Sequence, residues 1–108
     1  MDPGAESPKE TWLRLLIVRA GFPRPESQVP VYDQYGVLIG EVDHGWRDRK
    51  IAAEYDGGHH RTNPVVFRKD IRRIEALLAE GWIVVRVTSA DTEGGIIRRL
   101  QTAFAARS

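Results

Sequence analysis

Apolar residues recur along the chain in short blocks whose spacing alternates between helical and extended periods. The first block, Trp12 to Ala20, follows Ser7-Pro8-Lys9-Glu10, which combines an N-cap serine, a first-turn proline and a glutamate three residues after the cap. We predict a helix that begins there and ends at Gly21. Its apolar residues lie around most of the circumference, so we expect the helix to be largely covered.

Three extended segments follow this helix. Residues 27–33 and 37–43 predict two strands joined by a turn at residues 34–36, and residues 50–56 predict a third strand. Pro30 indicates that the first strand lies at a sheet edge or carries a bulge. Residues 44–49 are expected to connect the second strand to the third, so Asp43 is expected at the end of a strand. The run from Ile51 to Ala53 is typical of a strand covered on both faces.

The C-terminal half predicts a helix, a strand and a second helix. Thr62-Asn63-Pro64 marks a helix start and Gly81 a helix end, and residues 82–87 form an apolar strand that a helical crossover makes parallel to its neighbour. The order α-β-β-β-α-β-α predicts a single α/β sandwich with a mixed sheet. The apolar stripe of the first of these helices is Phe67, Ile71, Ile74 and Leu78, and that of the last is Ile96, Ile97, Leu100, Ala103 and Phe104.

Composition narrows the class of protein. The 108 residues suffice for one domain, which we place at residues 7–106 behind a flexible lead of residues 1–6. No cysteine is present, which excludes disulfides and thiolate sites, and no apolar run reaches the roughly 20 residues of a membrane span. We therefore expect a cytoplasmic protein without membrane contact. The formal net charge is only +1, but residues 61–73 hold five basic side chains against Asp70 alone, which indicates an anionic partner.

Acidic side chains gather around the predicted second and third strands. Asp43 and Glu54 come from paired strands and could supply oxygen ligands to Mg²⁺, which usually takes one or two protein carboxylates. The alternative is two solvated acids at strand ends. Asp56 shares a strand face with Glu54, but an aspartate before Gly57-Gly58 is also an ordinary turn residue.

Two histidines follow these acids directly. His59 or His60 could move a proton near neutral pH beside a metal ion, whereas the alternative is an exposed histidine pair in a loop. A zinc site is disfavoured because the chain has no cysteine and no histidine outside residues 44–60. Glu10 is explained locally as the third residue of the capping box.

The basic segment also has two interpretations. The first is contact with phosphate groups through Arg61, Arg68, Lys69, Arg72 and Arg73. The second is that residues 68–73 form a solvated helix face with an Asp70–Arg73 pair at helical spacing. Arg86 lies inside an apolar strand, so we expect it to meet a carboxylate or a phosphate.

Together these motifs resemble a known family over about residues 5–106. The matching segments are Glu6-Ser7-Pro8 with Glu10-Thr11, then Gln28, Val42-Asp43, Glu54-Tyr55-Asp56-Gly57, His59-His60-Arg61, Asp70 to Arg73, and Gly81 to Thr88. This pattern is similar to the bacterial domain-of-unknown-function 559 family, which is allied to very-short-patch-repair endonucleases within the PD-(D/E)XK nuclease superfamily.

The resemblance implies a restriction-endonuclease-like fold and Mg²⁺- or Mn²⁺-dependent hydrolysis of DNA phosphodiester bonds, with no small-molecule cofactor. It makes Asp43 and Glu54 the metal ligands, Glu10 a helix acid that reaches the site, and His59 or His60 the proton carrier. Longer relatives often carry an N-terminal winged-helix segment, and a homodimer is left open.

One departure from the family pattern concerns the reaction. Many superfamily members have lysine two positions after the glutamate, where this chain has Asp56, which can only add a ligand or orient His59 or His60. A structural zinc site like that of the repair enzymes is not expected without cysteine. The competing hypothesis is a catalytically silent nuclease-fold module that binds nucleic acid or a protein partner in a defence or toxin–antitoxin system.

Overall fold

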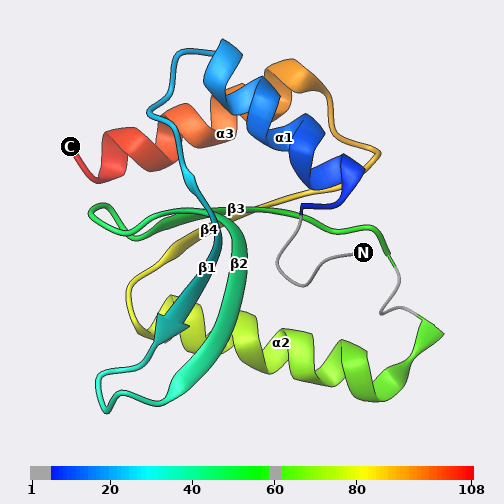
Figure 1. Ribbon diagram of the computed structural model, residues 1–108, viewed down its shortest axis with the longest axis vertical. Coiled ribbons are helices and arrows are strands. Elements are labelled where there is room, and N and C mark those ends of the chain that lie inside the picture. Colours follow the sequence, from blue (N-terminus) through cyan, green and yellow to red (C-terminus); the bar gives the residue numbers. More distant parts are fainter. Residues whose placement is uncertain (1–5, 59–61) are drawn as a thin grey trace.

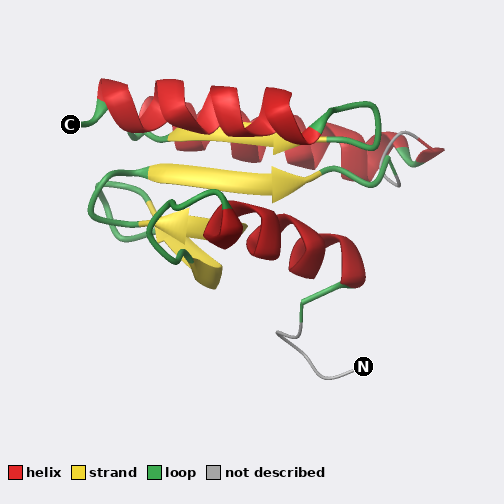
Figure 2. Cartoon of the chain, turned by 90° about the horizontal axis from the view of Figure 1, so that it is seen from above, coloured by secondary structure: helices red, strands yellow, loops and turns green. Residues whose placement is uncertain are grey.

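The computed structural model describes residues 6–58 and 62–108, which form a four-stranded mixed sheet between two helical layers. Figure 1 shows α1 and α3 on one face of the sheet and α2 on the other, and Figure 2 shows the same layers from above. This confirms the predicted α/β class and the order of the elements. Their bounds are α1 Pro8–Arg19, β1 Glu26–Tyr32, β2 Leu38–Trp46, β3 Ile51–Tyr55, α2 Pro64–Ala79, β4 Ile83–Val87 and α3 Glu93–Ala106.

The strands are arranged in sequence order across the sheet. β1, β2 and β3 form an antiparallel meander, and β4 pairs with β3 in parallel after the α2 crossover. Pro30 lies on β1, an edge strand, as predicted, and the β1–β2 register shifts between Val31 and Tyr32. Within the described residues, no helix is long and apolar enough to cross a membrane.

Two apolar cores lie on opposite faces of the sheet. One joins α1 and α3 to the sheet around Leu13, Ile17, Ile51 and Leu100, and the other joins α2 around Leu77. Ala52 and Ala53 face opposite cores, which confirms that this part of β3 is covered on both sides.

The coverage of α1 was predicted incorrectly. Leu13, Leu16 and Ile17 are buried, but Leu15 and Val18 remain 46% and 40% exposed. The helix packs against the sheet on one side and has no second layer above it. Its outer apolar residues therefore face solvent.

The orientation of α2 also differs from the prediction. Of the predicted stripe, Ile74 packs against the core, but Phe67, Ile71 and Leu78 are 45%, 44% and 54% exposed. Leu77 is the residue of α2 that is fully buried. The helix is rotated so that Asp70 and Arg73 turn toward the sheet, where they form ion pairs. These ion pairs set the face that α2 presents to the sheet.

β2 is longer than predicted. Asp43 lies inside β2, not at its end, because the strand continues through His44 and Gly45 to Trp46. The buried polar atoms of this extension have partners: His44 Nε2 lies 2.8 Å from the carbonyl oxygen of Glu10, and Trp46 Nε1 donates to the carbonyl oxygen of Pro23 at 2.8 Å. The connection to β3 is therefore only residues 47–50.

Candidate active site

A row of polar side chains crosses the sheet on adjacent strands. Ser27 pairs with His44 and Val29 with Val42, so Gln28 stands opposite Asp43 between them. The pairing of His44 with Ala53, continued by one residue, sets Asp43 opposite Glu54, and Glu54 pairs with Arg86 of β4. Side chains opposite each other in a sheet share a face. The fold therefore brings Asp43 and Glu54 together, as the sequence predicts.

Asp43 is held in a half-buried position with little positive charge around it. Its Oδ2 accepts a hydrogen bond from the Tyr55 backbone N–H at 2.9 Å. Burial raises the pKa of Asp43 to about 6; the carboxylates of Glu10 and Glu54 add to this effect, and the Tyr55 N–H and Arg73 oppose it. Within the described residues, Oδ1 has no hydrogen-bond partner.

Glu10 reaches the same region from α1. The Ser7 hydroxyl accepts from the Glu10 backbone N–H at 3.3 Å, which confirms the predicted N-cap. The Glu10 carboxylate turns away from the cap, and its Oε1 accepts from Gln28 Nε2 at 2.7 Å. The Glu10 carboxylate is therefore held by Gln28 close enough to Asp43 to raise the pKa of that carboxyl group.

Glu54 is neutralised within the fold. It is 4% exposed, and both of its oxygens accept from Arg73, Oε2 from Nη1 at 2.8 Å and Oε1 from Nη2 at 2.9 Å. Burial lowers the pKa of Arg73, but the contacts with Glu54 and Asp70 outweigh burial and raise that pKa. The stem of Arg73 passes over Gly40 of β2, where an added Cβ would lie 2.8 Å from Arg73 Cδ. The position of Arg73 is therefore fixed by its contacts with Glu54, Asp70 and Gly40.

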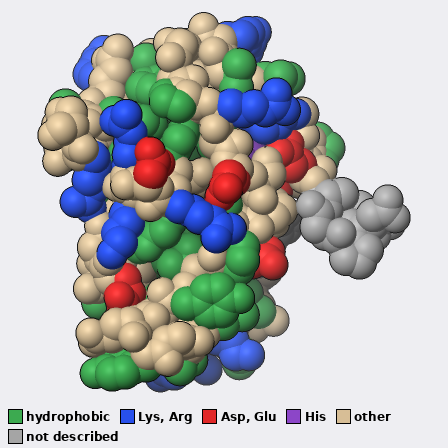
Figure 3. Space-filling model, turned by 60° about the vertical axis from the view of Figure 1, so that its left-hand side comes forward, with side chains coloured by type: hydrophobic (Ala, Val, Ile, Leu, Met, Phe, Trp, Pro, Cys, Tyr) green, Lys and Arg blue, Asp and Glu red, His purple; other side chains and the backbone are tan. Residues whose placement is uncertain are grey.

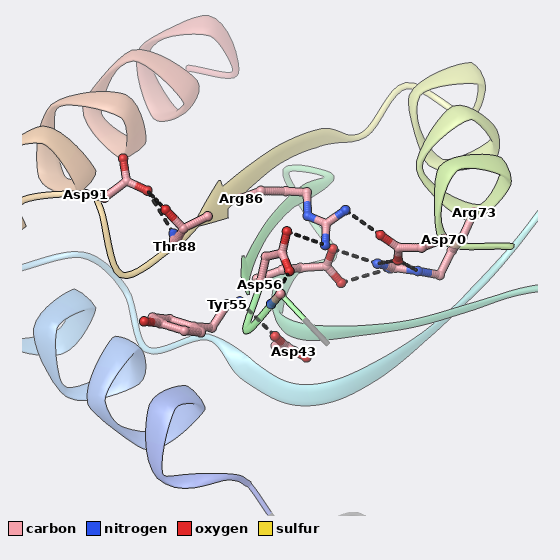
Figure 4. A network of polar contacts seen from close by, with 10 residues as sticks. Asp43, Tyr55, Asp56, Asp70, Arg73, Arg86, Thr88 and Asp91 are labelled. Carbon is pink, nitrogen blue, oxygen red and sulfur yellow. Dashed lines mark hydrogen bonds and ion pairs between the residues drawn. The ribbon is translucent and has the colours of Figure 1, made fainter. Parts of the chain in front are cut away.

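The ion-pair network extends from Arg73 to β4 (Figure 4). Asp70 accepts from Arg73 Nη2 at 2.9 Å and from Arg86 Nη1 at 2.5 Å, and Arg86 Nη2 lies 3.7 Å from Asp56. Burial raises the pKa of Asp70, but the two guanidinium groups hold it below its usual range. The predicted Asp70–Arg73 pair and the predicted carboxylate partner of Arg86 are both confirmed.

The other predicted site residues are placed as follows. Asp56 contacts Arg86, and its Oδ1 accepts from the Gly58 N–H at 2.8 Å, as expected of a turn residue. His59, His60 and Arg61 lie outside the described residues. The remaining predicted phosphate contacts, Arg68, Lys69 and Arg72, are exposed on α2 and form no ion pair with another described residue.

Positive charge is not confined to α2. Figure 3 shows the face at the connection between β2 and β3, where Lys and Arg side chains lie among acidic and apolar ones. Three cations that line one hollow at this connection are used within the fold. Lys50 Nζ donates to the carbonyl oxygen of Glu80 at 2.9 Å, Arg107 donates to that of Gly81, and Arg47 Nε donates to Glu26 Oε2 at 2.6 Å. This makes α2 the better candidate for contacts with an external anion.

His44 was missed as part of this region. The side chain is fully buried, its Nε2 bonds the Glu10 carbonyl oxygen, and its Nδ1 has no partner among the described residues. Burial lowers the pKa of His44, so the ring is neutral and Nε2 carries the proton that the carbonyl accepts. The alternation of Val42, His44 and Trp46 was the available signal, but residues 44–49 were expected to form the connection between the second and third strands.

The donor set fits a divalent cation in part. Asp43 offers a free oxygen beside Glu10, and the oxygens of Glu54 keep a second lone pair each while they accept from Arg73. Among the described residues, no group of three or more His, Asp or Glu side chains is arranged to hold a metal ion. Two carboxylates are enough for Mg²⁺, which keeps several water ligands.

Comparison with known proteins finds two similar sequences. The chain is 33% identical over 106 residues to uncharacterized protein Rv2248 of Mycobacterium tuberculosis strain ATCC 25618 / H37Rv, and equally to uncharacterized protein MT2308 of strain CDC 1551 / Oshkosh. The match covers 98% of this chain but 37% of each relative, so the chain spans little more than a third of their length. No family model and no solved structure matches the chain.

Proposed function

We propose that the chain is a metal-dependent DNA endonuclease of the very-short-patch-repair-like family that its motifs resemble. The observation that carries the proposal is the Asp43 carboxylate, which lies opposite Glu54 and near Glu10 and has its pKa raised to about 6 by burial and by these neighbours. The carboxylates of Glu10 and Glu54 both raise the pKa of Asp43, whereas Arg73, the cation that opposes them, is engaged with Glu54. A divalent cation would compensate the remaining negative charge.

The residues divide into three roles. Asp43 and Glu54 would hold Mg²⁺ or Mn²⁺, which when bound supplies an activated water and stabilises negative charge on a phosphate. Arg68, Lys69 and Arg72 are exposed on α2 beside this site and would hold the DNA backbone. His59 or His60 would transfer the proton.

Cleavage assays test the proposal directly. Duplex, nicked, mismatched and single-stranded DNA are incubated with Mn²⁺ and with wild type, Asp43→Asn, Glu54→Gln or Asp48→Asn. The last variant is a matched control, because the Asp48 side chain is 80% exposed at the far end of the β2–β3 hairpin. We expect wild type and Asp48→Asn to cut and the two site variants to fail. No cleavage of any DNA, or equal cleavage by all four proteins, contradicts the proposal.

A second candidate, a catalytically silent nuclease-fold module, is favoured by one observation. Arg73 already neutralises Glu54 with two hydrogen bonds, so this half of the site is stable without a metal ion. Calorimetry separates the candidates. DNA binding without Mn²⁺ uptake would support the silent module, and Mn²⁺ uptake that Asp43→Asn abolishes would support the enzyme.

A further inference from the structure

A cavity lies on the other side of β3 from Glu54. It has a volume of about 450 Å³ and opens between the first turn of α1, the end of β3 and the loop after β4. Its lining combines two aromatic rings, one ammonium group, two hydroxyls and a carboxylate, which belong to Trp12, Tyr55, Lys9, Thr88, Ser89 and Asp91.

The aromatic side chains form a platform with one open side. Trp12 and Tyr55 meet edge to face, with centroids 6.3 Å apart and planes at 87°, and both are half-buried against the α1–α3 core. Lys9 Nζ lies 5.7 Å above the Tyr55 ring, but this side chain is exposed and can be displaced from it. A flat heteroaromatic ring can therefore stack here with its face on an aromatic side chain.

The rim supplies polar groups of the kind that meet the edge of such a ring. Asp91 Oδ2 accepts from the Thr88 backbone N–H at 2.8 Å, which fixes the carboxylate at the mouth of the cavity. The Thr88 hydroxyl donates to Asp91 Oδ2 at 3.5 Å and accepts from the Ala90 N–H at 3.2 Å, which leaves it one lone pair to accept with. The Ser89 hydroxyl lies beside it and can donate or accept. Lys9 adds a positive charge that suits a phosphate attached to the ring through a sugar.

Tyr55 connects this cavity to the candidate active site. Its backbone N–H donates to Asp43, while its ring points away from the Asp43–Arg73 network toward α1 (Figure 4). Tyr55 follows Glu54 directly on β3. A nucleic-acid strand whose backbone is bound at Asp43 and Glu54 can therefore place a neighbouring nucleobase in the cavity.

We propose that this cavity is a subsite for one nucleobase of the nucleic-acid strand whose backbone lies at Asp43 and Glu54. The base stacks on Trp12 and Tyr55, its polar edge meets Thr88, Ser89 and Asp91, and Lys9 contacts the adjoining phosphate. The location of the strand rests on the proposed function, whereas base binding itself requires neither metal nor cleavage.

Tryptophan fluorescence in EDTA tests the subsite without catalysis. Trp12 is half-buried at the cavity, while Trp46 and Trp82 are buried in the cores, so Trp12→Phe identifies the responding signal and corrects for absorption by the ligand. The ligands are the four deoxynucleoside 5′-monophosphates and, as a baseless control, deoxyribose 5-phosphate. We expect saturable quenching by nucleotides that deoxyribose phosphate does not produce.

Three variants locate the binding. Tyr55→Leu is expected to weaken nucleotide binding between roughly fivefold and a hundredfold, the range for loss of one stacking contact. Tyr35→Leu is the matched control, because Tyr35 is 82% exposed on the distant β1–β2 turn, and should bind as wild type. Ser89→Tyr fills the cavity from an exposed loop and should block binding even if Tyr55→Leu fails to fold.

Absence of saturable quenching, equal quenching by deoxyribose phosphate, or unchanged affinity in Ser89→Tyr overturns the subsite. These results do not depend on nuclease activity. Cleavage without quenching would refute the subsite alone, and quenching without cleavage would refute the enzyme alone.

Discussion

Replacing Asp43 with asparagine is expected to stabilise the metal-free protein at neutral pH. Burial, together with Glu10 and Glu54, raises the pKa of Asp43 from an ordinary 3.8 to about 6. The folded protein therefore holds this proton more tightly than the unfolded chain. The stability that Asp43 contributes is fully present below about pH 4 and is lost as the pH rises through about 6. Asparagine carries no charge and can still accept the hydrogen bond from Tyr55.

The size of the effect follows from this pKa. The difference between 3.8 and about 6 corresponds to about 3 kcal/mol, because each pKa unit is worth about 1.4 kcal/mol. Asp43 is only half-buried, so solvent screening reduces the expected gain to about 1–2 kcal/mol. For a domain of this size that gain raises the Tm by roughly 5–10 °C.

Thermal denaturation in EDTA at pH 7.5 and pH 4.5 measures the gain. Asp43→Asn should melt above wild type at pH 7.5, and the difference should shrink to roughly a third at pH 4.5, where Asp43 is neutral in the folded protein but still mostly ionised in the unfolded chain. The exposed Asp48→Asn should match wild type at both pH values. If Asp43→Asn melts below wild type at pH 7.5, or if the difference is the same at both pH values, the raised pKa is refuted.

Three further predictions concern the groups around Asp43. Arg73→Met leaves Glu54 buried without its partner and should lower the free energy of unfolding, measured in urea, by about 3–5 kcal/mol. The double variant Arg73→Met with Glu54→Gln should recover part of this loss. If the losses of the two single variants simply add, the pairing is refuted. Gly40→Ala should cost about 1–3 kcal/mol, because φ at residue 40 is +155° and the new Cβ meets the Arg73 stem. The loss should be smaller in an Arg73→Ala background, where only the backbone strain remains, and an equal loss there would show that the Arg73 contact contributes nothing. Burial lowers the pKa of His44, so its contribution is present above about pH 6.5 and lost as the pH falls through its folded pKa. In an Asp43→Asn background, the free energy of unfolding should therefore fall from pH 7 to pH 5, and replacing His44 with Gln should remove this fall. Parallel pH profiles of stability with and without His44→Gln would contradict the lowered pKa of His44.

The parts of the fold with local signals could be predicted from the sequence. Ser7 and Pro8 set the start of α1, and Asn63, whose Oδ1 accepts from the Val65 and Val66 N–H groups, sets the start of α2. The alternation of apolar residues indicated the strands, and Asp70 and Arg73 pair at helical spacing. Each of these features depends on residues only a few positions apart.

The features that were missed depend on partners distant in the sequence. His44 and Trp46 extend β2 because acceptors from α1 and from the connection after it lie within reach. α2 turns Asp70 and Arg73 toward the sheet because Arg86 and Glu54 lie there as their partners. The ion pairs form at the expense of burying Phe67, which stays exposed. Periodicity alone favours the apolar face, because it carries no information about buried ion pairs.

The short β2–β3 hairpin also bears on the order in which the molecule assembles. The Asp43–Tyr55 bond closes a loop across 12 residues, whereas the Arg73–Glu54 clamp spans 19 and needs α2 to be formed and docked. Shorter loops close at lower entropic cost, so we expect the hairpin to bring the two acids together before the guanidinium arrives. Repulsion between the Asp43 and Glu54 carboxylates would then raise the free energy of the folding transition state. Removing the charge of Asp43 should accelerate refolding in a chevron experiment, as well as raising equilibrium stability.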